Sequence, residues 1–247
     1  MIGLALAIVA ATRLLGGDHW RIDTDNGPVH VFCPAGYDAA RAGTVVYIHG
    51  YWDDVDEAWR EYKLADQLDA SGKQALFVVP EAPQTLDDEV RWASLGDLLR
   101  AVHAATGLPR PSGPVVVIGH SAAYRTIVPW LDYEPLENVI LLDAFYGNEE
   151  DYVRWLSEAK GHASHRLTIV ADDTVRFAEP FVKRFKDAVA LAALPDAWNE
   201  LPPEAKKARL LYIRSQARHM QLVTDGKWLP LLLQRAPLRD RAKVRAP

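Results

Sequence analysis

The chain has 247 residues, of which 49% are hydrophobic and 25% are charged. This composition excludes disordered and fibrous proteins, and the length suits one α/β domain with a large core. The net charge of −5 argues against nucleic acid as a partner, because phosphate binding needs a basic surface. Cys33 is the only cysteine, which excludes an internal disulfide and a cysteine-type zinc site.

Two terminal segments stand apart in composition. Residues 1–11 are almost purely apolar and end in small residues, as in an export signal, but no Lys or Arg precedes them. Residues 1–19 are therefore interpreted either as an export signal, in an exported protein, or as an N-terminal segment of a cytoplasmic one. The apolar run is shorter than the ~20 residues of a membrane-spanning helix, so we expect no stable membrane anchor. Five basic residues crowd positions 235–247, which are predicted to form a flexible basic tail.

Residues 20–234 alternate short β-rich runs with helix-like stretches, which is typical of a single α/β domain. The β-rich runs contain mostly Val, Ile and Leu and little charge, as in strands buried on both faces of a sheet. These runs are 29–33, 44–49, 75–79, 114–119, 138–143, 167–171 and 210–214. The predicted helices are 56–70, 95–105, 121–130, 149–159, 177–193 and 227–233. The pattern predicts a mainly parallel sheet with helices on both of its faces.

One of these strands is followed by a serine that has small residues close to it in the sequence. The run 115–118 is all β-branched and leads through Gly119 to Ser121, after which a helix is predicted. A serine on such a strand-to-helix turn is exposed above the sheet, and the next amide, that of Ala122, points to where an acyl oxygen would become negative. Ser121 could also simply cap the helix. Its place at the end of a buried strand favours a nucleophile.

A histidine follows the last predicted strand, 210–214, after a short loop. Of the eight histidines, His219 alone has this position. A hydroxyl group is a poor nucleophile until a base takes its proton, so we interpret His219 as the general base for Ser121.

Two strands offer a carboxylate that could orient this histidine. Asp143 ends the apolar run 138–143, where an unpaired carboxylate would be costly and a partner is therefore expected. Asp172 and Asp173 follow the run 167–171 in a polar turn, where both could simply be solvated. This comparison favours Asp143 as the acid and keeps Asp173 or Asp172 as the alternative.

These motifs together resemble the α/β-hydrolase superfamily. The segment Gly119-His120-Ser121-Ala122-Ala123 is similar to its nucleophile elbow, G-x-S-x-G, with alanine for the last glycine, and the order serine, acid, histidine is kept. The strand 44–49 ends in His49-Gly50, as the superfamily's third strand does before its oxyanion-hole loop. The resemblance implies an oxyanion hole made of the backbone amides of Tyr51 and Ala122.

The implied activity is cleavage of an ester, thioester or amide bond, in a small molecule or a polymer, through an acyl-enzyme on Ser121. Trp52 is placed beside the oxyanion loop as a substrate-binding residue of the pocket. The sequence has no metal-ligand cluster, phosphate-binding loop or dinucleotide fingerprint, so no cofactor or metal is expected. Two other interpretations stay open: a catalytically silent binding module of the same fold, and a peptidase or amidase acting on an envelope polymer.

Overall fold

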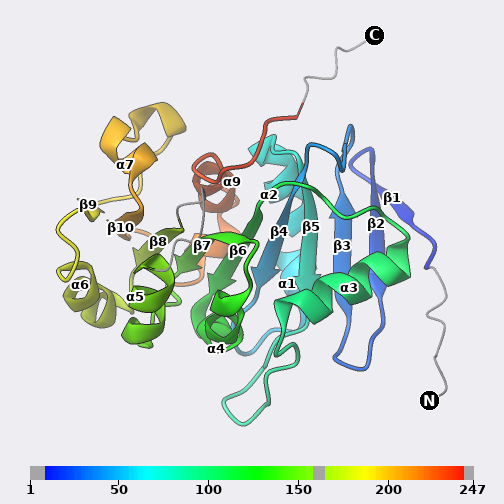
Figure 1. The fold of residues 1–247 in the computed structure, drawn as a ribbon, viewed down its shortest axis with the longest axis horizontal. Helices are drawn as coiled ribbons and strands as arrows, with labels where there is room; N and C mark the ends of the chain where they lie inside the picture. Colours follow the sequence, from blue (N-terminus) through cyan, green and yellow to red (C-terminus); the bar gives the residue numbers. More distant parts are fainter. Residues whose placement is uncertain (1–8, 158–164, 242–247) are drawn as a thin grey trace.

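A computed structural model describes residues 9–157 and 165–241, and in these residues ten strands form one sheet (Figure 1). The strand order is β1-β2-β3-β5-β4-β6-β7-β8-β10-β9. The antiparallel end of the sheet contains β1 (Thr12–Leu14), β2 (Gly17–Ile22) and β3 (Val29–Cys33). The parallel strands are β5 (Ala75–Pro80), β4 (Gly43–Ile48), β6 (Val115–His120), β7 (Leu136–Leu142), β8 (Arg166–Ala171), β10 (Leu210–Arg214) and β9 (Val189–Leu191). This sheet confirms the predicted α/β fold class.

Helices cover both faces of the sheet, which is why the central strands are buried at every position. One face packs against α3 (Leu95–Thr106), α4 (Tyr124–Ile127), α5 (Glu149–Ser157) and α6 (Val175–Val182). The other packs against α1 (Val55–Glu61), α2 (Leu64–Ser71), α7 (Pro203–Lys207), α8 (Gln221–Thr224) and α9 (Trp228–Leu233). Successive side chains of β4 point to opposite faces of the sheet. Val46 and Ile48 belong to the hydrophobic core on the first face, and Val45 and Tyr47 belong to the core on the second.

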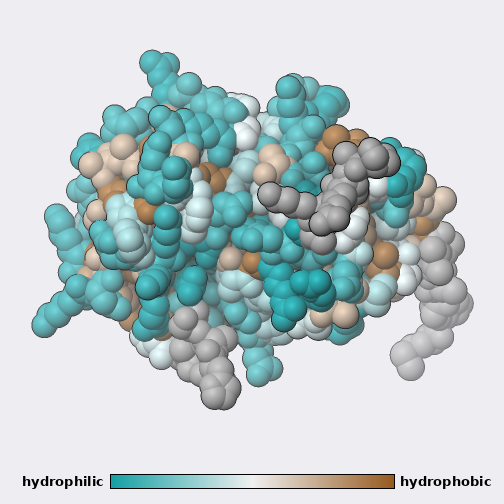
Figure 2. Space-filling model, turned by 90° about the horizontal axis from the view of Figure 1, so that it is seen from above, coloured by the Kyte–Doolittle hydropathy of each residue, from teal (hydrophilic) through white to brown (hydrophobic). Residues whose placement is uncertain are grey.

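The register of the parallel strands brings their carboxyl ends to one side of the sheet, here named the carboxyl edge. Gly119 of β6 pairs with Ile48 of β4 on one side and with Leu141 of β7 on the other. Leu141 in turn pairs with Ile169 of β8. The residues that follow these strands therefore meet at the bottom of the molecule in Figure 1, next to α4. The opposite end is mainly hydrophilic, with scattered apolar residues (Figure 2).

Three predicted helices are interrupted. The stretch 56–70 divides at Lys63, whose φ of 50° lies in the left-handed region, into α1 and α2. The stretch 121–130 becomes η1 (Ser121–Ala123), α4 and η2 (Val128–Asp132), where Pro129 lacks an amide hydrogen for the helical ladder. Helix α6 ends at Val182, and the rest of 177–193 contains β9. A further short helix, η3 (Trp198–Glu200), precedes α7.

The structure corrects both domain boundaries. Strands β1 and β2 belong to the sheet, so the fold includes residues that the sequence assigned to a separate segment, 1–19. At the other end, Arg235 is buried and Arg241 donates to the backbone oxygen of Asp69, so 235–241 are packed and not a flexible tail. Most of the apolar run interpreted as an export signal, residues 1–8, and the last residues, 242–247, lie outside the described residues. No helix in 9–157 or 165–241 has the length and apolar character needed to cross a membrane.

Candidate active site

Ser121 occupies a strained turn directly after β6. Its φ is 55°, in the left-handed region that side chains other than glycine seldom adopt. The turn is crowded: a Cβ on Gly50 would lie 2.7 Å from the Cβ of Ser121, and one on Gly119 would lie 2.8 Å from the Cβ of Ala123. Glycine at 50 and 119 is therefore required by close packing. The result is a half-buried serine held at the carboxyl edge, between a strand and a helix.

His219 and Asp143 form a direct hydrogen bond at the same edge. His219 Nδ1 lies 2.6 Å from Asp143 Oδ2, although 76 residues separate them along the chain. Asp143 follows β7 and is fully buried, whereas the His219 side chain is 25% exposed. Because Nδ1–H donates to the carboxylate, the second ring nitrogen, Nε2, is left as the acceptor. That is the tautomer a general base requires.

The Asp143 carboxylate accepts four further hydrogen bonds, all from the turn after β8. The backbone amides of Asp172 and Asp173 donate over 2.9 and 3.1 Å. Thr174 donates from its amide over 2.9 Å and from its hydroxyl over 2.6 Å. Burial raises the pKa of Asp143, but the hydrogen bonds from His219, Thr174 and the amides outweigh it and hold that pKa well below its ordinary value. In return, the hydrogen bond to Asp143 raises the pKa of His219.

The alternative acids, Asp172 and Asp173, have a different position. The Asp173 carboxylate is 3.9 Å from His219 Nδ1, and its side chain is 70% exposed. Its contribution to the site, like that of Asp172, is the backbone amide that donates to Asp143. The structure thus brings Asp143, and not its two rivals, into hydrogen-bond contact with His219.

The sequence analysis did not single out His120, whose ring packs against that of His219. Its buried ring is 4.5 Å from that of His219, centroid to centroid, and its Nε2–H donates to the backbone oxygen of His219 over 3.1 Å. Burial lowers the pKa of His120 to about 3, so its ring stays neutral and adds no charge beside the base. It occupies the first of the two variable positions in the G-x-S-x-G pattern, and that pattern carries no signal for this contact.

The predicted oxyanion donors lie on the loop after β4 and in the first turn of η1. Ala122 is the second residue of η1, where amides precede the first helical hydrogen bonds. His49 orients the β4 loop: Nδ1–H donates to the Gly50 oxygen over 2.8 Å, and Nε2 accepts from the Ala82 amide over 3.0 Å. The Trp52 amide is engaged by the Gln84 oxygen at 2.9 Å. Among the described residues, no acceptor is found for the Tyr51 amide.

Trp52 does not line the interior of a pocket. Its φ is 75° and its side chain is 85% exposed. The sequence interpretation placed Trp52 in the pocket, whereas in the structure its side chain extends into solvent.

Arg125 is a second residue that the sequence did not indicate. It lies four positions after Ser121, on α4, and donates to the Tyr51 hydroxyl over 2.6 Å. It also donates to the backbone oxygens of Thr85, Leu86 and Asp88 over 2.7 to 3.1 Å. In Figure 1 this loop, between β5 and α3, extends below the sheet beside α4. Arg125 therefore ties the loop to the helix that carries the candidate nucleophile.

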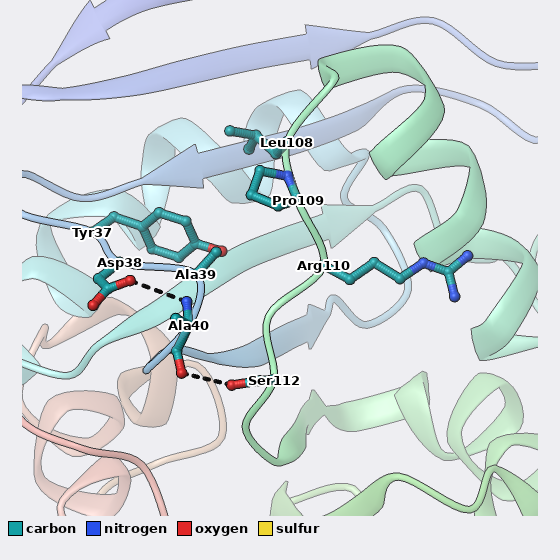
Figure 3. Close-up of a pocket in the computed structure, with 8 residues that line it drawn as sticks. All are labelled: Tyr37, Asp38, Ala39, Ala40, Leu108, Pro109, Arg110 and Ser112. Atoms are coloured by element: carbon teal, nitrogen blue, oxygen red, sulfur yellow. Dashed lines mark hydrogen bonds between the residues drawn. The ribbon is translucent and has the colours of Figure 1, made fainter.

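Asp143, Asp173 and His219 are the cluster in the described ranges whose ligand atoms could reach one metal ion, all within 4.8 Å of one another. Five donors already surround the Asp143 carboxylate, which favours a hydrogen-bonded acid over a metal ligand. A hollow of about 700 Å³ lies elsewhere, near the amino ends of β4 and β6 (Figure 3). It is lined by Tyr37, Asp38, Ala39, Ala40, Leu108, Pro109, Arg110 and Ser112. None of these is a predicted site residue.

No protein-family model and no curated protein sequence match the chain. Several solved structures match it over most of its length. An S-formylglutathione hydrolase from Agrobacterium tumefaciens has 9% identity and a TM-score of 0.58, with 92% of this chain and 97% of that one covered. A feruloyl esterase module from Clostridium thermocellum has 12% identity and a TM-score of 0.57, covering 92% and 94%. A dienelactone hydrolase from Anabaena variabilis has 12% identity and a TM-score of 0.52, covering 89% and 95%.

Proposed function

Because the chain has the α/β-hydrolase fold, we propose that it is a serine hydrolase that cleaves an acyl bond, first of all an ester, through an acyl-enzyme on Ser121. The observation that carries this proposal is the 2.6 Å hydrogen bond between His219, in the loop after β10, and buried Asp143, at the end of β7. A carboxylate buried at the cost of desolvation and bonded to one ring nitrogen of a histidine serves to orient that ring. Ser121 follows the neighbouring strand.

In the proposed reaction, Ser121 Oγ attacks the carbonyl carbon while His219 Nε2 takes the hydroxyl proton. The backbone amides of Tyr51 and Ala122 donate to the oxygen that becomes negative. His219 then passes its proton to the leaving alcohol, and the acyl group stays on Ser121. A water molecule, deprotonated by the same Nε2, attacks the acyl-enzyme, releases the carboxylic acid and restores the serine. Asp143 stays ionised throughout and stabilises the imidazolium.

The electrostatics support this division of roles. The pKa of Asp143 is held low, so this group does not accept the proton that His219 carries. The raised pKa of His219 makes it a stronger base than an ordinary histidine. Buried, neutral His120 provides a surface for the ring of His219 without competing for its proton.

The test is hydrolysis of p-nitrophenyl acetate by the parent protein and by Ser121→Ala. We expect the variant to lose at least a thousandfold in kcat while its melting temperature changes little, because one half-buried hydroxyl contributes little to stability. Activity of Ser121→Ala within tenfold of the parent would contradict the nucleophile. Absence of turnover in the parent, on esters and amides alike, would favour the silent binding module instead.

A further inference from the structure

Tyr146, in the segment after β7, lies next to the candidate nucleophile. Its hydroxyl is within hydrogen-bonding reach of the Ser121 hydroxyl. Tyr146 follows the acid Asp143 by three residues, so both side chains enter the site from the end of the same strand. Asp143 before it and Gly147 and Asn148 after it have φ values of 49°, 127° and 61°. The backbone is therefore bent sharply on either side of this tyrosine.

Aromatic packing fixes the position of the Tyr146 ring. Phe145, the residue before it, is fully buried and lies 4.7 Å from Phe181 of α6, measured between ring centroids. The Tyr146 ring itself lies 5.5 Å from Tyr124 of α4 and 5.9 Å from Phe177 of α6. Tilted aromatic pairs at such distances attract each other beyond the area that they bury. The hydroxyl of Tyr146 is thus presented by a ring that its neighbours hold in place.

The candidate base and Tyr146 approach Ser121 from opposite faces of the sheet. The ring of His219 packs against His120, which lies next to Tyr62 of the core on the second face. Tyr146 instead packs against α4 and α6, which cover the first face. Ser121 Oγ therefore has a proton acceptor on one side and a hydroxyl group on the other.

The Tyr146 hydroxyl keeps its proton under ordinary conditions. Burial raises the pKa of Tyr146 above its ordinary value of 10, and the negative charge of Asp143 raises it further. The contact with Ser121 lowers this pKa, but by less than the other two effects raise it. The hydroxyl is therefore a neutral donor that does not compete with His219 for the serine proton.

We propose that Tyr146 is a further catalytic residue, whose O–H donates a hydrogen bond to Ser121 Oγ while that oxygen carries negative charge. The inference rests on the proposed function, because it adds a residue to the same reaction. In acylation, the serine proton passes to His219 Nε2 and an electron pair of Oγ forms the bond to the carbonyl carbon. In deacylation that bond breaks, its electron pair returns to Oγ, and His219 gives the proton back. The Tyr146 proton stays on its own oxygen in both steps.

The test is Tyr146→Phe, which removes the donor and keeps the ring. We expect kcat/KM for p-nitrophenyl acetate to fall about 10- to 100-fold, less than the ~10²–10³ for an oxyanion donor, because the charge on Oγ is only partial. The midpoint of the pH–rate profile should stay at the parent value, since His219 and Asp143 are unchanged. Tyr124→Phe is the matched control: it removes the same atom from the neighbouring ring on α4, and it should keep the parent rate.

A comparison of leaving groups tests whether the hydrogen bond is made to Ser121 Oγ. The value of kcat/KM, which reports acylation, is measured for phenyl acetate and for p-nitrophenyl acetate. A donor to Oγ predicts the same factor of loss in Tyr146→Phe for both esters. A larger loss for phenyl acetate, the ester with the poorer leaving group, would place the donor on the leaving oxygen and overturn the assignment.

Labelling with an alkyl fluorophosphonate separates the failure of this inference from the failure of the proposed function. The labelling rate of Ser121 should fall in Tyr146→Phe by a factor similar to that of kcat/KM. If the parent is labelled on Ser121 and Tyr146→Phe has the parent rates of labelling and hydrolysis, the inference alone is overturned. A shifted pH midpoint in Tyr146→Phe also overturns it, because the loss would then come from a displaced His219. A parent that neither labels nor hydrolyses esters or amides overturns the proposed function and this inference with it.

Discussion

Asp143 combines a strained backbone with a carboxylate that accepts many hydrogen bonds. Its φ of 49° is in the same unfavourable region as that of Ser121. Five hydrogen-bond donors meet its carboxylate, four of them from the turn that Asp172, Asp173 and Thr174 form. A strained backbone conformation persists only where the surrounding structure fixes it, and here the five donors to the carboxylate do so.

Asp143→Asn should lower kcat by up to ~10⁴, because the amide cannot hold His219 in the required tautomer or stabilise its charged form. An amide nitrogen would also face backbone donors, so we expect a loss of about 1–3 kcal/mol in the free energy of unfolding. Asp172→Asn and Asp173→Asn are the controls, since their side chains do not make these bonds. Steady-state rates and denaturant unfolding of the three variants decide the matter: a large loss confined to Asp173→Asn would move the acid to the β8 turn.

The pH dependence of kcat/KM follows from His219. The base must be neutral to accept a proton, and its pKa is raised above the ordinary 6.5 by the hydrogen bond to Asp143. Activity should therefore fall as the pH decreases, with a midpoint above 6.5 in the parent. Asp143→Asn removes the main cause of the shift, so the midpoint of its residual activity should move to lower pH. A parent midpoint below 6.5 in a pH-rate profile would contradict the proposed pairing.

At the scale of elements, Arg125 connects α4 to the loop between β5 and α3. Arg125→Met removes donors to the Tyr51 hydroxyl and to three backbone oxygens, so the oxyanion loop and the loop between β5 and α3 should both lose their fixed positions. We expect kcat/KM for p-nitrophenyl acetate to fall about 10- to 100-fold, and Tm to fall by several degrees, as for a loss of about 1–3 kcal/mol. Arg91→Met is the control, because Arg91 is an exposed residue of the same loop. Matching rates in the two variants would mean that Arg125 has no positioning role.

The apolar runs predicted the central strands well because strands buried on both faces need uninterrupted Val, Ile and Leu. Strand β2 was not predicted: in its sequence, GDHWRI, half-buried His19 and exposed Arg21 alternate with buried Trp20 and Ile22 near the edge of the sheet. Strand β9 has only three residues, too few for a recognisable period. In the site, the order of serine, acid and histidine was visible in the sequence, whereas the contacts of His120 and Arg125 arise only when distant segments come together.

At the scale of the whole molecule, the C-terminal segment closes the fold. The buried guanidinium of Arg235 donates to the Thr168 hydroxyl over 2.7 Å and to the Ala205 oxygen over 3.0 Å, and it also bonds the Ala208 oxygen. It thereby joins β8 to the segment that contains α7. Burial lowers the pKa of Arg235 to about 9, which reflects the cost of enclosing this charge. The basic residues around Arg235 led the sequence analysis to predict a solvated tail. Charge composition alone does not reveal which of these arginines is buried.

Arg235→Ala should reduce the free energy of unfolding by about 2–4 kcal/mol, because three buried acceptors lose their donors. Arg239→Ala, at an exposed position four residues on, should stay within about 0.5 kcal/mol of the parent. Thermal and denaturant unfolding measure both. Equal stabilities of the two variants would show that the segment beginning at 235 does not contribute to the fold.

The central claim is that Ser121 is a nucleophile activated by the pair His219 and Asp143. The most direct measurement is intact-mass and peptide mass spectrometry after incubation with an alkyl fluorophosphonate. The account predicts one adduct per chain, located on Ser121, absent from Ser121→Ala and formed at least a hundredfold more slowly by His219→Ala. An adduct on another residue, or equal labelling rates in the parent and His219→Ala, would contradict it.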